Sequence, residues 1–199
     1  CYVNPADVAL LYEHGDIDKR YGFVMGGGKP EGAFVPKKED VVPPCAVKTL
    51  PVQDGDVFDL GGVQIEAIAV PGHTAGTMVY LDRARRVLYS GDACNANTLL
   101  GLPCSTTVET YAKSLDHLAT YLKGIDKFYG GHGLQAVPAY IVDEAMILCE
   151  EILSDDDDRF ETEFLGRKFL YARKFDGMFH REDGGIANIA YVMEKVYNK

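Results

Sequence analysis

The sequence lacks an apolar run long enough to cross a bilayer, and it lacks an excess of positive charge. Its 30 Asp and Glu residues outnumber its 20 Lys and Arg residues, which gives a formal net charge of −10. A general nucleic-acid surface needs Lys and Arg to neutralise phosphates, so this balance argues against one. The missing apolar run argues against a transmembrane helix. We expect neither nucleic acid nor a membrane as partner.

Paired cysteines are also lacking. The five cysteines are an odd number, without the close pairs of a disulfide framework. Reduced thiols favour the cytoplasm as the location. The acidic run at residues 155–158 has neither the spaced oxygen ligands nor the glycine of an EF-hand loop. It is interpreted as a solvated loop or helix end, not as a calcium site.

Three short glycine-rich segments each contain one side chain suited to binding a metal ion. They are VPGHTAG with His73, YSGD with Asp92, and GGHG with His132. Imidazole and carboxylate bind zinc, iron or manganese. Each segment follows a stretch that reads as a β-strand, and glycine lets the backbone turn sharply there. The pattern places three potential ligands in loops that can share one cleft.

The order of these segments, with separations of 19 and 40 residues, resembles the second half of a metallo-β-lactamase-superfamily hydrolase. The resemblance implies an α/β (α+β) fold, the four-layer αβ/βα sandwich. It also implies that His73 serves one metal, that His132 serves a second, and that Asp92 bridges them. These three residues would then be both the metal ligands and the catalytic residues.

The resemblance further implies two zinc ions per complete site, with iron or manganese as alternatives. A metal-bound hydroxide would attack the substrate carbonyl, and a metal would stabilise the developing oxyanion. The expected substrate is a small ester, thioester or lactone, as in a glyoxalase II-like hydrolase. Two other classes stay open. One is an oxidoreductase of the flavodiiron type, which would need a flavin domain downstream. The other is a non-catalytic binding or assembly module.

The family's first metal motif, His-x-His-x-Asp-His, is absent from the sequence. The nearest candidate, His14-Gly15-Asp16-Ile17-Asp18, has one histidine and is interpreted as a helix end and loop. We therefore expect the amino-terminal half of the fold to be missing. Residues 1–153 would form the second half of the domain, and 154–199 a carboxy-terminal extension near the active-site cleft. With only two protein ligands left per metal, the chain alone is expected to be inactive.

Each candidate ligand also has an ordinary structural interpretation. His73 would be a turn histidine satisfied by backbone, Asp92 would cap the Asn95–Asn97 turn, and His132 would be exposed to water. Cys94 invites a nucleophile hypothesis, which we discount because a metal hydroxide needs no thiol. The initial Cys1 also permits a lipoprotein or an amidohydrolase with an amino-terminal nucleophile. The first would normally have a flexible tether after the cysteine, and the second leaves the three ligands unexplained.

The extension carries the candidates for substrate binding. In the glyoxalase II branch, basic carboxy-terminal residues hold an anionic part of a thioester substrate. By that resemblance, the candidates are Arg167, Lys168, Tyr171, Arg173 and His180. The alternative is that the basic residues form the polar face of a hairpin and that His180 lies in a surface loop.

Periodicity and capping residues predict the regular elements. We expect helices over 5–13, from a Thr106–Glu109 capping box, from Pro138, and over 186–197. Two of them have buried stripes: Tyr111, Leu115, Leu118 and Leu122 in one, and Ile141, Ala145, Leu148 and Ile152 in the other. Strands are expected at 47–50, 57–58, 63–70, up to 81, from 87, and at 128–129, with a long loop over 22–46.

Without the other half of the sandwich, one side of the strands would be exposed. The residues expected at risk are Val63, Ile65, Val79, Leu81 and Leu88. We therefore expect a homo-oligomer, or association with the missing amino-terminal half. A small molecule is the expected substrate.

Overall fold

The computed structural model describes residues 1–12, 38–40, 46–132, 136–164, 167–176 and 179–199. His14 and most of the predicted loop over 22–46 lie outside these residues. In chain order the elements are β1 (Tyr2–Val3), η1 (Pro5–Asp7), α1 (Val8–Tyr12), η3 (Lys38–Asp40), β2 (Leu50–Pro51), β3 (Val57–Asp59), β4 (Gln64–Ala69), β5 (Met78–Asp82), β6 (Val87–Gly91), β7 (Thr98–Leu99), α3 (Val108–Ala119), β8 (Lys127–Gly130), β9 (Val137–Pro138), α4 (Ile141–Leu153), β10 (Phe160–Phe164), β11 (Arg167–Tyr171), β12 (Ile189–Tyr191) and η4 (Met193–Lys195).

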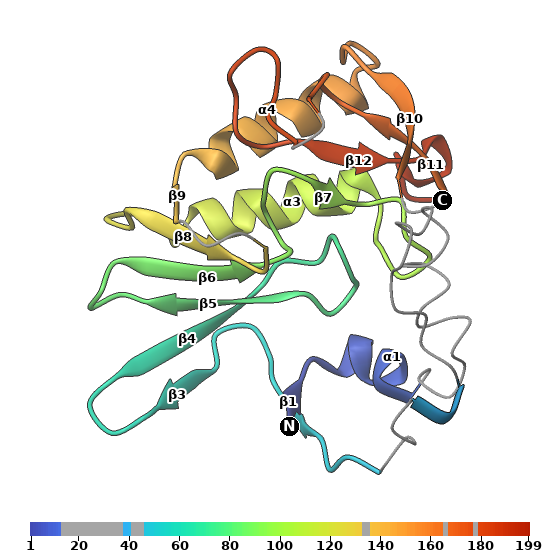
Figure 1. The fold of residues 1–199 in the computed structure, drawn as a ribbon. Coiled ribbons are helices and arrows are strands. Elements are labelled where there is room, and N and C mark those ends of the chain that lie inside the picture. Colours follow the sequence, from blue (N-terminus) through green and yellow to red (C-terminus); the bar gives the residue numbers. More distant parts are fainter. Residues whose placement is uncertain (13–37, 41–45, 133–135, 165–166, 177–178) are drawn as a thin grey trace.

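The main structural unit is a six-stranded sheet in the order β3-β4-β5-β6-β8-β9 (Figure 1). Its strand pairs are antiparallel except β6 and β8, which are parallel. A parallel pair needs a crossover, and α3 supplies it between β6 and β8. The arrangement β6-α3-β8 places the ends of these two strands at the same edge of the sheet.

One face of this sheet is covered by α3 and α4, which lie side by side (Figure 1). Side chains alternate between the two faces of a strand, so the register shows which residues share a face. Leu81, Leu88 and Phe128 are directly paired across β5, β6 and β8 and are fully buried. They share one apolar core with the buried stripes of the helices, such as Leu115 and Leu148. The sequence predicted both helical stripes.

The opposite face of the sheet carries aromatic side chains. Tyr80, Tyr89 and Tyr129 are directly paired across β5, β6 and β8. Tyr89 and Tyr129 remain 44% and 39% exposed, and their rings stack with centroids 6.1 Å apart. Phe58 extends the row, with its ring centroid 6.4 Å from that of Tyr80. We call Phe58, Tyr80, Tyr89 and Tyr129 the open face.

The open face is not made of the residues expected from the sequence. Val79, Leu81 and Leu88 point to the helices and are fully buried, so their predicted exposure was wrong. Ile65 does lie on the same side of the sheet as the open face, where it is directly paired with Phe58. The error came from the pleat, because two adjacent residues of one strand belong to opposite faces.

A second sheet has the order β10-β11-β12-β7. It joins β7, from the middle of the chain, to the segment beyond residue 154. The pairing of β12 with β7 is parallel, and the Leu100 amide donates to the carbonyl of Ala190 at 2.7 Å. The predicted helix over 186–197 is therefore wrong: this segment is β12 followed by the single 3-10 turn η4. The boundary between 153 and 154 stays a prediction.

The helix and strand ends agree with the sequence predictions only in part. Asn4 caps the first turn by accepting from the Ala6 amide at 3.0 Å, as predicted, but residues 5–7 form a 3-10 turn. The cap of α3 is Thr107, not Thr106, and Glu109 pairs with Lys113. Pro138 does not open α4. It lies in β9, paired with Lys127.

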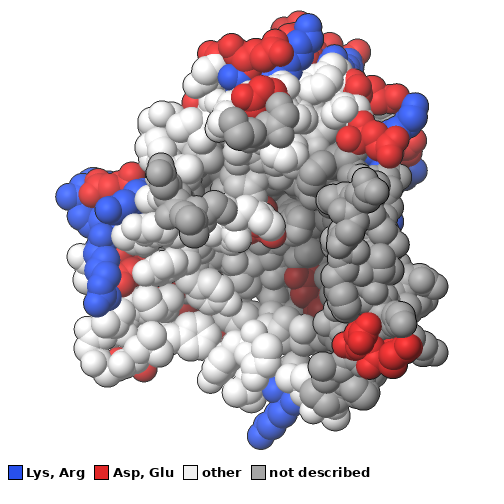
Figure 2. Space-filling model, viewed as in Figure 1, with Lys and Arg blue, Asp and Glu red and all other residues white. Residues whose placement is uncertain are grey.

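Charges of both signs mix on the surface. Figure 2 shows Lys and Arg near Asp and Glu at the edges of the face viewed, whereas its middle is mostly uncharged. The acidic run is not wholly solvated as expected, because the side chain of Asp157 is buried and accepts from the Tyr191 hydroxyl at 2.6 Å. Cys1, Cys94 and Cys149 are free thiols, and Cys94 and Cys149 are buried. Among the described residues, every helix is too short or too polar to span a membrane.

Candidate metal centre

Strand direction brings the three predicted ligands together. Because β4 and β6 are both antiparallel to β5, and β8 is parallel to β6, the strands β4, β6 and β8 run in the same direction. Their carboxyl ends therefore meet at one edge of the sheet. His73 follows β4, Asp92 follows β6, and His132 follows β8. Side chains 19 and 40 residues apart in the sequence thus share one location.

His73 is held with one ring nitrogen facing Asp92. Its Nδ1 lies 3.1 Å from the carbonyl oxygen of Leu99. A carbonyl only accepts, so Nδ1 must carry the proton, and in the neutral ring Nε2 keeps its lone pair. Nε2 lies 4.0 Å from Oδ2 of Asp92. The backbone fixes the tautomer that leaves Nε2 free to bind a metal ion.

Asp92 is the centre of the group. Its Oδ1 lies 3.4 Å from Nε2 of His132 and is buried without a hydrogen bond. Gly131 makes this approach possible, since a Cβ there would lie 2.6 Å from Oδ1. The alternative role, capping the next turn, is taken by others: Asn95 accepts from the Asn97 amide, and Thr98 accepts from the Asn95 amide. A buried carboxylate oxygen without a donor is costly unless a cation faces it.

His132 completes the group at its exposed side. Its side chain is 83% exposed, and the preceding Gly131 amide donates to the Gly91 carbonyl at 2.8 Å. That hydrogen bond ties the His132 loop to the turn that carries Asp92. Among the described residues, however, no three His, Cys, Asp or Glu side chains converge closely enough to hold a metal ion. The three side chains therefore form two pairs that share Asp92, one with His73 and one with His132. Each pair could contribute two ligands to a metal ion, but the three residues do not form a complete ligand set around one ion.

Comparison with known families agrees with this geometry. The family profile described as "Metallo-beta-lactamase superfamily" matches residues 6–159, which is more than half of the chain. The chain belongs to the metallo-beta-lactamase superfamily. The matched region includes all three candidate ligands and both helices that cover the sheet.

The chain is similar in sequence to curated proteins that include two named hydrolases. The human protein "Acyl-coenzyme A thioesterase MBLAC2" is 31% identical over 86 residues, which are 42% of this chain and 31% of that protein. "Hydroxyacylglutathione hydrolase" of Brucella anthropi is 36% identical over 101 residues, 49% of this chain and 36% of that protein. The chain spans about a third of the length of these curated relatives.

A solved structure shows the same fold. The metallo-beta-lactamase family protein TTHA1429 of Thermus thermophilus matches with a TM-score of 0.53 and 21% identity. The match covers 77% of this chain and 54% of that one. It supports the superfamily fold predicted from the three glycine-rich segments.

The predicted substrate-binding residues are placed mainly in the second sheet and beyond it. Arg167 and Lys168 begin β11 with exposed side chains, and Lys168 pairs with Glu161 at 2.7 Å. Arg173 pairs with Glu151 of α4 at 2.5 Å. His180 is exposed and lies 3.1 Å from Asp176. Their role in binding a substrate of this superfamily member stays a prediction.

Tyr171, the fifth of these residues, is fully buried in an aromatic cluster. Its ring centroid lies 4.6 Å from that of Phe175 and 5.8 Å from that of Phe160. Burial raises the pKa of Tyr171 to about 12, so the phenol stays neutral. In this structure the side chain packs the second sheet.

Two groups around His73 were not anticipated from the sequence. The Leu99 carbonyl orients the imidazole, and the buried Ser105 hydroxyl donates to the His73 carbonyl at 2.8 Å. A backbone carbonyl leaves no signal in the sequence, and a serine before a helix is ordinarily a cap. Cys94 is buried, which raises the pKa of its thiol to about 12. A thiol of this kind is a poor nucleophile, in agreement with the prediction from the sequence.

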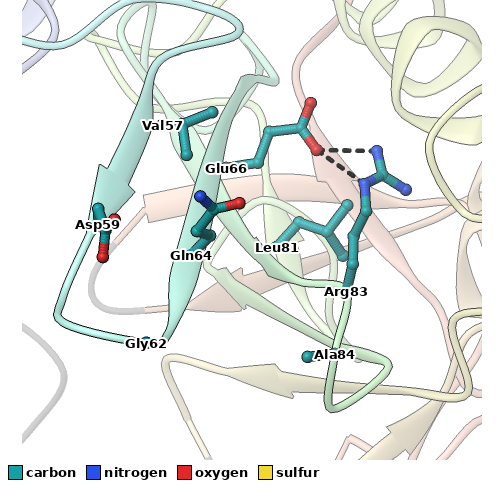
Figure 3. Close-up of a pocket in the computed structure, with 8 residues that line it drawn as sticks. All are labelled: Val57, Asp59, Gly62, Gln64, Glu66, Leu81, Arg83 and Ala84. Atoms are coloured by element: carbon teal, nitrogen blue, oxygen red, sulfur yellow. Dashed lines mark hydrogen bonds and ion pairs between the residues drawn. The ribbon is translucent and has the colours of Figure 1, made fainter.

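A cavity of about 530 Å³ lies elsewhere on the sheet. Its lining, drawn in Figure 3, comes from β3, β4, the turn between them, the end of β5 and the turn after β5: Val57, Asp59, Gly62, Gln64, Glu66, Leu81, Arg83 and Ala84. Glu66 and Arg83 form an ion pair in its wall at 2.8 Å. The lining comes from the start of β4, whereas His73 follows its end. The cavity therefore lies toward the edge of the sheet opposite the candidate metal centre.

Proposed function

We propose that this chain is part of a metal-dependent hydrolase that cleaves a small thioester, ester or lactone. One observation carries the proposal: Asp92 lies between the Nε2 atoms of His73 and His132, with a buried oxygen that has no hydrogen-bond donor. That arrangement suits a carboxylate shared by two cations. The names of the two hydrolase relatives support the reaction class, and the thioesterase among them favours a thioester.

The residues have separate roles in this proposal. In its neutral ring, His73 presents Nε2 with a lone pair because the Leu99 carbonyl accepts from Nδ1. Asp92 supplies the negative charge at the centre, and His132 supplies a second imidazole at the solvent side. Zinc is the metal that we propose, two ions per complete site, and iron or manganese would accept the same ligands. When bound, the metal would lower the pKa of water and polarise the substrate carbonyl.

Substitution of the three ligands in the full-length gene product tests this proposal. Asp92→Asn should reduce thioester hydrolysis by more than about 100-fold, because it removes the charge on which both metal positions depend. His73→Ala and His132→Ala should each lose most activity and one metal ion. The measurements are release of free thiol from an acyl-coenzyme A and elemental analysis of the dialysed protein.

His117→Ala is the matched control. His117 also pairs with an aspartate, Asp54 at 3.1 Å, but lies on α3. This variant should keep both activity and metal. Wild-type turnover and metal content in all three ligand variants would show that the assignment is wrong. Metal binding without hydrolysis would favour a non-catalytic module.

A further inference from the structure

An aspartate from the start of the chain contacts the loop that carries His73. Asp7, in the turn η1, accepts two hydrogen bonds from this loop. Its Oδ2 accepts from the Thr74 hydroxyl at 2.5 Å, and its Oδ1 accepts from the Gly76 amide at 2.8 Å. Both oxygens of the carboxylate therefore bind one short segment that begins directly after His73.

The hydroxyl groups of the loop are ordered by this contact. A carboxylate only accepts, so Thr74 must donate its hydroxyl proton to Asp7. The Thr77 hydroxyl, 2.8 Å from that of Thr74, must then donate to it. Thr77 in turn accepts from the Thr74 amide at 2.9 Å. Every donor in this series has one acceptor, and the series ends on Asp7.

Gly76 is shaped to receive the carboxylate. A Cβ at this position would lie 2.6 Å from Cγ of Asp7, closer than two such atoms approach. The backbone conformation of Gly76 does not require glycine, so the close approach of Asp7 explains why a residue without a Cβ occupies this position. Asp7 is not the cap of its own helix, because Asn4 already accepts from the Ala6 amide. Its two acceptor oxygens are directed at the His73 loop.

We propose that Asp7 is a positioning residue that holds the His73 imidazole in its orientation toward Asp92. The His73 backbone is then fixed from two sides. On one side Asp7 binds the residues that follow it, and on the other Ser105 donates to its carbonyl. A backbone held in this way keeps Nδ1 against the Leu99 carbonyl and Nε2 free. We call this hold on the His73 backbone by Asp7 and Ser105 the clamp. The effect of the clamp on metal binding rests on the proposed function, whereas its effect on the orientation of the imidazole does not.

The clamp is tested in the metal-free 199-residue chain by nitrogen NMR of the His73 ring. At about pH 8, above the usual histidine pKa of about 6.5, the wild type should show one tautomer with the proton on Nδ1. Asp7→Ala and Thr74→Val should shift His73 toward a mixture of both tautomers. Thr74→Ser keeps the hydroxyl and should restore the wild-type spectrum. Asp59→Ala removes a comparable turn aspartate, which accepts from the Gly61 amide, and should change nothing.

The wild-type His73 spectrum in both folded variants would overturn the proposal. If Asp7→Ala fails to fold, Thr74→Val decides, because it removes only one hydroxyl. Zinc titration of the same resonances in the full-length gene product separates the two claims. Zinc should bind the Asp7→Ala variant about tenfold more weakly than the wild type. A full-length wild type whose His73 and His132 signals never respond to zinc would contradict the proposed function and leave the clamp standing.

Discussion

At the scale of single residues, the carbonyl groups near Asp92 depend on side chains from other elements. Tyr111 of α3 is fully buried, and its hydroxyl donates to the carbonyl of Ala93 at 2.7 Å. Its ring also fills the space beside Gly72, where a Cβ would lie 2.4 Å from the ring. Tyr111 thus packs against the loop that precedes His73 and donates a hydrogen bond to the residue that follows Asp92.

Tyr111→Phe should lower the free energy of unfolding by about 1–2 kcal/mol, because the buried Ala93 carbonyl loses this donor. Urea unfolding measures the change. Tyr140→Phe is the control, since Tyr140 is 52% exposed, and it should change stability by less than about 0.5 kcal/mol. Equal stability of Tyr111→Phe and the wild type would mean that the Ala93 carbonyl is satisfied in another way.

At the scale of elements, the turn between β5 and β6 depends on an ion pair. Asp82 is 1% exposed and pairs with Arg85 at 2.7 Å, and it also accepts from the Arg85 amide at 2.9 Å. These hydrogen bonds to Arg85 lower the pKa of Asp82 below its usual value. The folded protein therefore favours the charged carboxylate more than the unfolded chain does.

The stability of the folded protein should therefore depend on pH through the carboxyl group of Asp82. Because the pKa of Asp82 is lower in the folded protein than in the unfolded chain, its carboxylate stabilises the fold at pH values above the unfolded-state pKa of about 3.9. This stabilisation is lost as the pH falls through the folded-state pKa. Asp82→Asn should therefore be less stable than the wild type at neutral pH, and the difference should shrink on acidification below about pH 4. Arg85→Met should show the same change by removing the partner. Thermal unfolding at several pH values measures it. A difference that stays constant with pH would contradict the role of this pair.

At the scale of the whole molecule, the open face leaves aromatic surface in water. Phe58, Tyr80, Tyr89 and Tyr129 form a continuous row across the sheet, and the rings of Tyr89 and Tyr129 stack in the open. Burial of apolar surface drives association, so such a face favours a partner. We propose that the 199-residue chain pairs with a second copy of itself through this face.

Light scattering on the 199-residue chain should therefore report a dimer or a higher assembly. The double variant Tyr89→Lys and Tyr129→Lys places two like charges at directly paired positions and should be monomeric. Ile147→Lys, at a residue of α4 that is 53% exposed, should leave the assembly unchanged. A wild type that stays monomeric and melts cooperatively would instead identify a self-sufficient domain.

Features that depend on neighbours along the chain could be predicted from the amino-acid sequence. The buried stripes of α3 and α4 follow from apolar residues at helical spacing, and Asn4 with Pro5 marked the first turn. The three glycine-rich segments predicted the superfamily fold, which the family match confirms. Their residues also predicted His73, Asp92 and His132 as one group, and strand direction brings these side chains together. Their role as ligands stays a prediction.

Features that depend on residues distant in the sequence could not be predicted in this way. The segment Ile189–Tyr191 lies within the predicted helix over 186–197, but forms a strand because β7, about 90 residues earlier, supplies its hydrogen bonds. The contact of the Leu99 carbonyl with His73 and the contact of Asp7 with the loop after His73 also join residues that are far apart in the sequence. Backbone hydrogen bonds and long-range contacts carry no periodic pattern, because their free energy comes from groups that meet only after the chain has folded.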